Sequence, residues 1–161
     1  MFDVLVYLYE NYWRPDACPD HEQLWRKLSA VGFETDDIHE ALSWLDGLTP
    51  AVPPLSEPSP MPPPLAAQAH SVRIYLPQEQ TALGEECIGF IHFLEHSGVL
   101  TSTLRELVID RALAAVGFEP GPLALDDLKI IILMVFWSMG QEPDSLVLDE
   151  LFVAPEDRLI H

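Results

Sequence analysis

The chain has 161 residues, of which 48% are hydrophobic and 21% charged, and its formal net charge is -18. This composition predicts a folded core and argues against a disordered chain, while the excess of acids argues against unaided binding to DNA or RNA. The longest purely apolar run, residues 130–137, is far shorter than the ~20 residues that span a bilayer, so no membrane-spanning segment is expected.

Three helices are expected in the first 48 residues. Apolar side chains recur at helical spacing over residues 2–12, 20–32 and 35–48. Gly32 closes the second pattern, and glycine favours the left-handed conformation that commonly ends a helix. These patterns predict an N-terminal three-helix lobe over residues 1–48.

A proline-rich segment follows. Eight of the fifteen prolines lie between residues 49 and 64. Proline fixes φ and lacks an N–H donor, so neither a helix nor a sheet interior can form there. We interpret residues 49–71 as an extended linker. A ligand for SH3-type domains is the alternative, but no basic residue flanks "PSPMPPP". A linker of this length permits two lobes that share one core as well as two independent lobes.

A C-terminal helical lobe is expected over residues 72–161. The stretch "SVRIYL", residues 71–76, alternates in polarity and predicts either a short strand or an extended stretch. Helices are expected over residues 77–97, 103–117, 126–140 and 143–152. The third of these is apolar on all sides after its first turn, which is typical of a central helix. The chain is therefore predicted to be all-α, with helical hairpins in two packed lobes joined by the proline-rich linker.

Polar residues mark the expected helix starts. Asp20 and Thr35 are placed to cap the second and third N-terminal helices. Thr103 and Glu106 have the spacing of a capping box, in which each residue satisfies a free N–H group of the other. Asp126 is expected to cap the central helix.

One phrase occurs twice, as "LSAVGFETDD" (residues 28–37) and "LAAVGFEPGPLALDD" (residues 113–127). Each copy reads as a helix end, a glycine turn, a phenylalanine and acids at the next helix start. We favour this interpretation, in which each copy is the boundary between two helices, over a duplicated binding unit. Residues 28–48 also resemble the three-helix repeats of RecX-type recombination regulators, which contact a nucleoprotein filament through a basic surface that this chain lacks.

A second resemblance spans the whole chain. The blocks "MFDVLVYLYENY", "GFETDDIHEALSWLDGL", "RIYLPQE", "GFIHFLEHSGVL", "RELVIDRALA" and "LDDLKIIILMVFW" are similar, in this order, to those of the Smg family of proteobacterial proteins. The resemblance implies no established molecular function, no assigned catalytic residues and no cofactor. Genes of this family often neighbour one for a DNA-uptake processing protein.

No catalytic residue is assigned, because the sequence lacks the phosphate-binding, dinucleotide-binding and nucleophile-elbow motifs. The stretch "HFLEH" fits the H-x-x-E-H pattern of inverted zincins, with His92 and His96 on one helical face and Glu95 between them. A zinc site needs a further ligand from another element, so no metal and no cofactor are expected, and the chain is predicted not to be an enzyme.

Basic residues are rare, with only eight in the chain. We therefore expect Arg73, Arg105 and Arg111 to have defined acidic partners within the fold, and Asp126 and Asp127 are the predicted ones. The alternative is ordinary surface pairing, which contributes under ~1 kcal/mol.

Five residues are candidates for contact with a partner. Trp44 lies beside the expected apolar face of its helix, so partial exposure is predicted, and exposed tryptophan favours interaction surfaces. Asp36 and Asp37 begin the same helix, and Arg73 and Tyr75 lie in the alternating segment after the linker.

These observations predict a non-catalytic acidic adaptor that binds a basic protein, either a nucleic-acid-processing factor or a translation factor. A nucleic-acid-associated regulator resembling RecX repeats and a zinc-binding protein using His92 and His96 are the alternatives. Direct nucleic-acid binding and membrane insertion are not expected. Two cysteines without a secretory signal favour reduced thiols in the cytoplasm.

Overall fold

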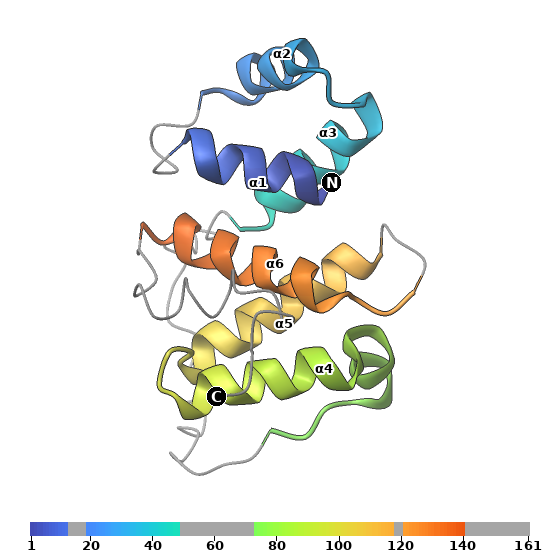
Figure 1. Cartoon of the computed structure of the whole chain (residues 1–161), viewed down its shortest axis with the longest axis vertical. Helices are drawn as coiled ribbons and strands as arrows, with labels where there is room; N and C mark the ends of the chain where they lie inside the picture. The colour runs from blue at the N-terminus through green and yellow to red at the C-terminus, as the bar shows by residue number, and fades with distance from the viewer. Residues whose placement is uncertain (13–18, 49–72, 118–120, 141–161) are drawn as a thin grey trace, which may run out of the picture.

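The computed structural model describes residues 1–12, 19–48, 73–117 and 121–140, which Figure 1 shows in colour. These residues form six helices and no strand, so the predicted all-α class is confirmed. The helices are α1 (Phe2–Asn11), α2 (His21–Val31), α3 (Thr35–Asp46), α4 (Pro77–His96), α5 (Ser102–Val116) and α6 (Leu125–Ser138).

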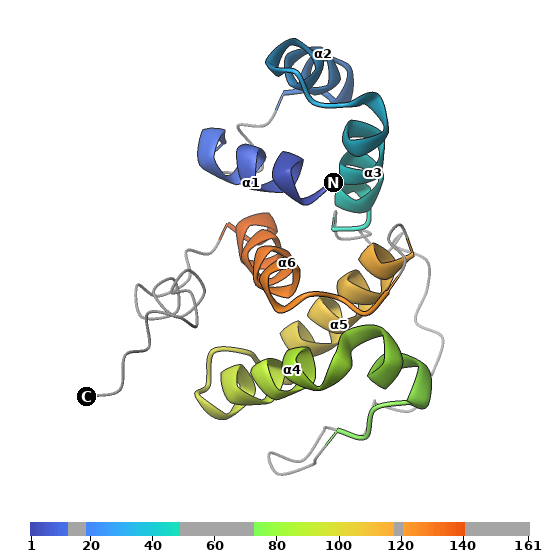
Figure 2. The same cartoon turned by 45° about the vertical axis from the view of Figure 1, so that its right-hand side comes forward.

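Helix α6 lies in the middle of the molecule, as its sequence predicts (Figures 1 and 2). Helix α1 packs on one side of it, and α5 packs on the other side. Helix α3 contacts both α1 and α5, α4 covers α5, and α2 packs on α3 at one end. Because neighbours surround α6, residues 131–137 are all buried, and no polar face remains over that stretch.

The regions before and after the proline-rich segment share one hydrophobic core. Buried side chains of α1 and α3 belong to the same cluster as those of α4, α5 and α6. Two tryptophans join the regions further: Trp44 Nε1 donates to the main-chain oxygen of Arg111 at 2.9 Å, and Trp137 Nε1 donates to that of Tyr12 at 2.7 Å. Residues 1–48 therefore fold against the helices that follow the segment, which itself lies outside the described residues.

Three helix starts differ from their prediction. Helix α5 begins at Ser102, and Thr101 caps it by accepting a hydrogen bond from the Leu104 N–H at 3.3 Å. The expected capping box of Thr103 and Glu106 is wrong, because the Glu106 carboxylate accepts hydrogen bonds from arginines instead.

Helix α6 begins at Leu125, so Asp126 and Asp127 lie in its first turn, and the predicted cap at Asp126 is wrong. Helix α3 begins at Thr35, so Glu34 occupies the capping position that was predicted for Thr35. In contrast, Gly32 ends α2 in the left-handed conformation, with φ of 109°, as predicted.

The segment between residue 73 and α4 is neither helix nor strand. Of the two predicted conformations, the strand does not form over residues 73–76, and Leu76 is extended, with φ -67° and ψ 152°. The helix predicted over 143–152 lies outside the described residues.

Helix α4 contains a bend that the apolar spacing of its sequence does not predict. Gly84 adopts φ of 73° inside the helix, a conformation that glycine tolerates best. The bend leaves the Ala82 carbonyl free to accept a hydrogen bond from the Leu123 N–H at 2.8 Å. Cys87, one turn further on, is a buried free thiol whose pKa burial raises to about 11. Within the part of the chain that is described, no helix is both long enough and apolar enough to cross a membrane.

Candidate functional site

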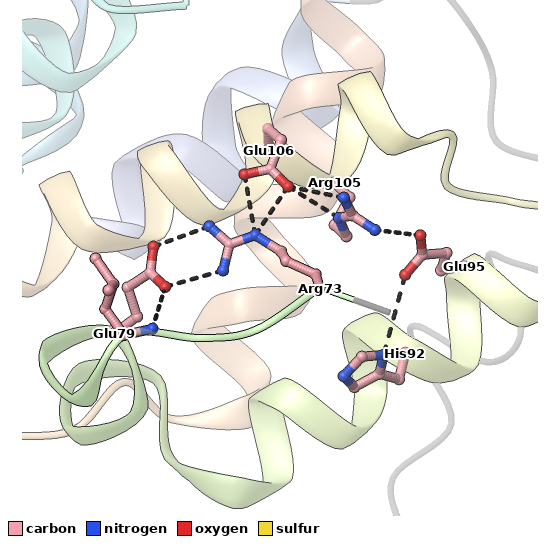
Figure 3. Close-up of polar contacts among 7 residues, drawn as sticks. Arg73, Glu79, His92, Glu95, Arg105 and Glu106 are labelled. Carbon is pink, nitrogen blue, oxygen red and sulfur yellow. Dashed lines mark hydrogen bonds and ion pairs between the residues drawn. The ribbon is translucent and has the colours of Figure 1, made fainter. Parts of the chain in front are cut away.

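Arg73 clamps the segment that leads into α4. Its two terminal nitrogens donate to the two carboxylate oxygens of Glu79, each at 2.9 Å, and its Nε donates to Glu106 Oε1 at 2.8 Å (Figure 3). Glu79 also accepts a hydrogen bond from the Leu76 N–H at 2.8 Å. The hydrogen bonds from Arg73 hold the pKa of Glu79 at about 2, and the pairing in turn raises the pKa of Arg73.

The network continues from Glu106 toward the C-terminal end of α4. Arg105 Nε donates to Glu106 Oε1 at 3.0 Å, and the Arg105 guanidinium also donates to Glu95. The second oxygen of Glu95 lies 3.9 Å from His92 Nδ1. Burial opposes ionisation of Glu106, but the hydrogen bonds from the two arginines outweigh it, so its pKa is lowered. As Figure 3 shows, this chain of charges ties the 73–76 segment, α4 and α5 together.

Tyr75 lies beneath this network. The Arg73 Cζ is 4.7 Å from the centre of the Tyr75 ring, and the His92 ring meets it edge-on at 5.5 Å. The side chain is buried, and its hydroxyl has no hydrogen-bond partner among the described residues. Burial raises the pKa of this phenol, although the positive charges of Arg73 and Arg105 oppose the shift.

The side chains between these residues point the other way. Ile74 is 87% exposed and Leu76 is 62% exposed, whereas Arg73 and Tyr75 are turned inward. This is the alternation expected of extended backbone, in which successive side chains leave on opposite sides. The segment therefore has an anchored inner face and an apolar outer face.

The network is suited to holding the chain in place. Its carboxylates (Glu79, Glu95 and Glu106) outnumber its arginines (Arg73 and Arg105) by three to two, so it has one net negative charge when His92 is neutral. Each carboxylate accepts from a guanidinium, and hydrogen bonds between charged groups are stronger than those between neutral groups. Glu106, with a side chain that is 49% exposed, is the member most open to an approaching cation.

The structure places the other predicted interaction residues differently. Trp44 is only 2% exposed, so its predicted exposure is wrong: α3 is covered by both α1 and α5, which widens its buried face. Asp37 Oδ1 accepts a hydrogen bond from the α-amino group of Met1 at 2.6 Å. Asp36 is exposed.

The predicted acidic partners of the arginines are also wrong. Arg73 and Arg105 pair with the glutamates of α4 and α5, and Arg111 pairs with its neighbour Asp110 at 2.5 Å. Asp126 pairs with Lys129 within α6, at 3.7 Å. Sequence reasoning missed Glu79, although its third position in a helix that starts with proline is a common site for an acid that binds the preceding N–H group.

The three residues of the zinc motif are used in other contacts. Glu95 binds Arg105, and His96 Nδ1 lies 3.0 Å from the main-chain oxygen of His92. Over residues 1–12, 19–48, 73–117 and 121–140, no three histidine, cysteine or acidic side chains converge to form a metal site.

Comparison with known proteins gives one consistent result. Residues 1–161 match the family described as Protein of unknown function (DUF494). The chain is 63% identical over 161 residues to a Protein Smg homolog of Methylibium petroleiphilum and 60% identical over 168 residues to one of Leptothrix cholodnii. It is 50% identical over 164 residues to a third, from Herminiimonas arsenicoxydans. Each of these alignments covers 100% of both chains. No solved structure matches the chain.

Proposed function

Since the chain belongs to the DUF494 family, which confirms the Smg resemblance, we propose that it is a non-catalytic acidic adaptor that binds a basic protein in the cytoplasm. The family description gives no molecular role, so the proposal depends on the distribution of charge on the surface of this chain. A nucleic-acid-processing or translation factor is the proposed class of partner, because such proteins have basic surfaces.

The observation that supports the proposal is that the basic side chains are already engaged in contacts within the chain. In the described parts of the chain, every basic side chain has an intramolecular contact. Five form ion pairs with acids, and Lys27 lies against the Tyr12 ring, with Nζ 5.6 Å from its centre. The paired side chains are Arg26, Arg73, Arg105, Arg111 and Lys129.

The acidic side chains, in contrast, outnumber the basic ones by 26 to 8, so most of them cannot be neutralised within the chain. Glu34 and Asp36 are exposed at the start of α3, and Glu85 and Glu86 are exposed on α4. With a formal charge of -18 over the chain, the surface attracts basic partners and repels phosphate backbones. Complementary charge accelerates association and makes binding sensitive to salt.

The test is capture of partners by the full-length protein from a lysate of its source cells, with parallel washes at low and high salt. Nuclease treatment of the lysate removes partners that are bridged by nucleic acid. We expect a basic protein that is retained at low salt and released at high salt. Its affinity, measured with purified components, should be lower for Glu34→Gln/Asp36→Asn or for Glu85→Gln/Glu86→Gln, depending on which face it contacts. Affinity that is unchanged by salt and by both variants would rule out the acidic adaptor.

A further inference from the structure

We propose that residues 73–76 are a preorganised docking element, whose side chains Ile74 and Leu76 contact an extended basic segment of the partner in which apolar residues alternate with lysine or arginine. This inference rests on the proposed adaptor function and specifies the surface and the chemistry of its ligand.

The first argument is the exposure of two large apolar side chains on one short segment. Ile74 and Leu76 are more exposed than the other large hydrophobic residues described, at 87% and 62%. A single exposed apolar side chain is ordinary on a protein surface. These two alternate with Arg73 and Tyr75, which are turned inward, so both lie on the outer side of the segment and form one apolar strip.

The second argument is the number of contacts that hold this strip in place. The Arg73 guanidinium is fixed by Glu79 and Glu106, and the Tyr75 ring is buried under it. The main chain is fixed as well, because the Leu76 N–H donates to Glu79 and the Tyr75 carbonyl accepts from Gln80 Nε2 at 3.1 Å.

Ordering a flexible segment on binding costs free energy, and a segment that is already ordered avoids that cost. The contacts of Arg73, Tyr75 and the main chain therefore favour binding by Ile74 and Leu76, and they leave both of these side chains exposed. If Ile74 and Leu76 belonged to the hydrophobic core, both would be buried.

The third argument is charge. Glu106 binds the guanidinium of Arg73, the residue next to Ile74, and its side chain is 49% exposed. The surrounding network has one net negative charge, with three glutamates against two arginines. Glu106 lies on the inner side of the segment with Arg73, whereas Ile74 leaves on the outer side. Successive side chains of an extended peptide also leave on opposite sides, so a partner residue that contacts Ile74 directs the next side chain toward the side of Glu106. An outer apolar strip and an accessible carboxylate on the inner side therefore fit an extended peptide with alternating apolar and basic residues.

The experiment uses the full-length protein and two fluorescent peptides of equal length and charge. In the first peptide leucine and lysine alternate, and in the second serine replaces every leucine. Fluorescence anisotropy gives the affinity of each peptide for wild type, Ile74→Ser/Leu76→Ser and Val31→Ser. Val31 is the matched control, because it is 53% exposed on α2 at the far end of the molecule from residues 73–76 (Figures 1 and 2). Leu76 is the N-cap of α4, where serine is a favoured residue, so the double variant is expected to fold normally.

We expect wild type and Val31→Ser to prefer the leucine peptide by about tenfold or more, and the double variant to bind both peptides equally. Glu106→Gln should weaken binding of both peptides and keep the preference for leucine. If wild type binds the two peptides equally and releases both at high salt, the adaptor function stands and the docking element is wrong. If wild type binds neither peptide at low salt, the docking element is wrong, and the capture experiment decides the adaptor function separately. Equal loss of preference in Val31→Ser and the double variant would also overturn the docking element.

Discussion

The Trp44 indole of α3 donates its N–H to the main-chain oxygen of Arg111 on α5 at 2.9 Å, which links helices on either side of the proline-rich segment. The ring is 2% exposed, and α3 packs against α1, α2 and α5. Trp44 therefore contributes to the joining of the N-terminal helices to the rest of the fold.

Replacing Trp44 with phenylalanine should lower the free energy of unfolding by about 1 kcal/mol for the lost hydrogen bond, with a further loss from the smaller ring. Urea denaturation measures this difference. Trp25→Phe is the control, because Trp25 is 39% exposed on α2 and its replacement should change stability by less than about 0.5 kcal/mol. Equal effects of the two substitutions would contradict the assigned role of Trp44.

The Arg73–Glu79 pair predicts a specific dependence of stability on pH. The pKa of Glu79 falls from its ordinary 4.5 to about 2 in the folded chain. A lowered pKa in the folded state stabilises the protein above the unfolded pKa, and this contribution is lost as the pH falls toward the folded value. Near neutral pH, Glu79→Gln should therefore cost about 3 kcal/mol, since it removes one partner of a buried pair.

Below about pH 4.5 the difference between wild type and Glu79→Gln should shrink, and it should nearly vanish near pH 2. Urea denaturation at several pH values measures it. Glu85→Gln, a change of the same type at an exposed position of α4, should leave stability almost unchanged at each pH. A Glu79→Gln effect that is constant from pH 7 to about pH 2 would show that the carboxylate is not the stabilising group.

The buried hydroxyl of Tyr75 is predicted not to stabilise the fold. This group is buried without a hydrogen-bond partner among the described residues, and an unpaired buried hydroxyl costs free energy. Tyr75→Phe should therefore keep or raise the melting temperature, while Tyr75→Ala should lower stability by about 3 kcal/mol or more through loss of the ring. A drop of more than about 1 kcal/mol in Tyr75→Phe would reveal a partner for the hydroxyl.

Gly47 and Arg111 are predicted to be coupled. A Cβ at Gly47 would overlap the guanidinium of Arg111, although the backbone of Gly47, at φ -72° and ψ -15°, suits any residue. In an Arg111→Ala background, Gly47→Ala should stabilise the protein by about 0.4–1 kcal/mol through the lower entropy of the unfolded chain. In wild type the gain should be smaller or reversed, because the guanidinium must move. Identical effects in the two backgrounds, measured by a double-mutant cycle, would exclude this contact.

Helix positions were largely predictable, because helix formation depends on neighbours three and four residues apart. The apolar spacing over residues 2–12, 20–32 and 35–48 anticipated the first three helices, and the continuous apolar run after Lys129 anticipated a central α6. Helix starts were predicted less well: Thr101 caps α5 in place of Thr103, because Glu106, the other half of the expected capping box, binds Arg73 and Arg105.

The candidate site was anticipated only in part. The rarity of bases and the alternation of the segment indicate Arg73 and Tyr75, and both belong to the network that anchors residues 73–76. Their contacts with Glu106 and His92 could not be predicted, because those residues lie in other helices whose separation in space is not encoded by spacing along the chain.

The sequence by itself determined an all-α, strongly acidic member of the DUF494 family with a central apolar helix, since these properties follow from composition, local periodicity and similarity. Tertiary structure decided which side chains are covered. Trp44 is buried because α3 has neighbours on several sides, whereas Trp25 stays partly exposed on α2, which packs mainly on α3. Ile74 and Leu76 remain outside because Arg73 and Tyr75 fill the inner side of their segment. A periodic pattern gives the direction of a side chain relative to its own element, and the element packed against that face determines whether it is buried.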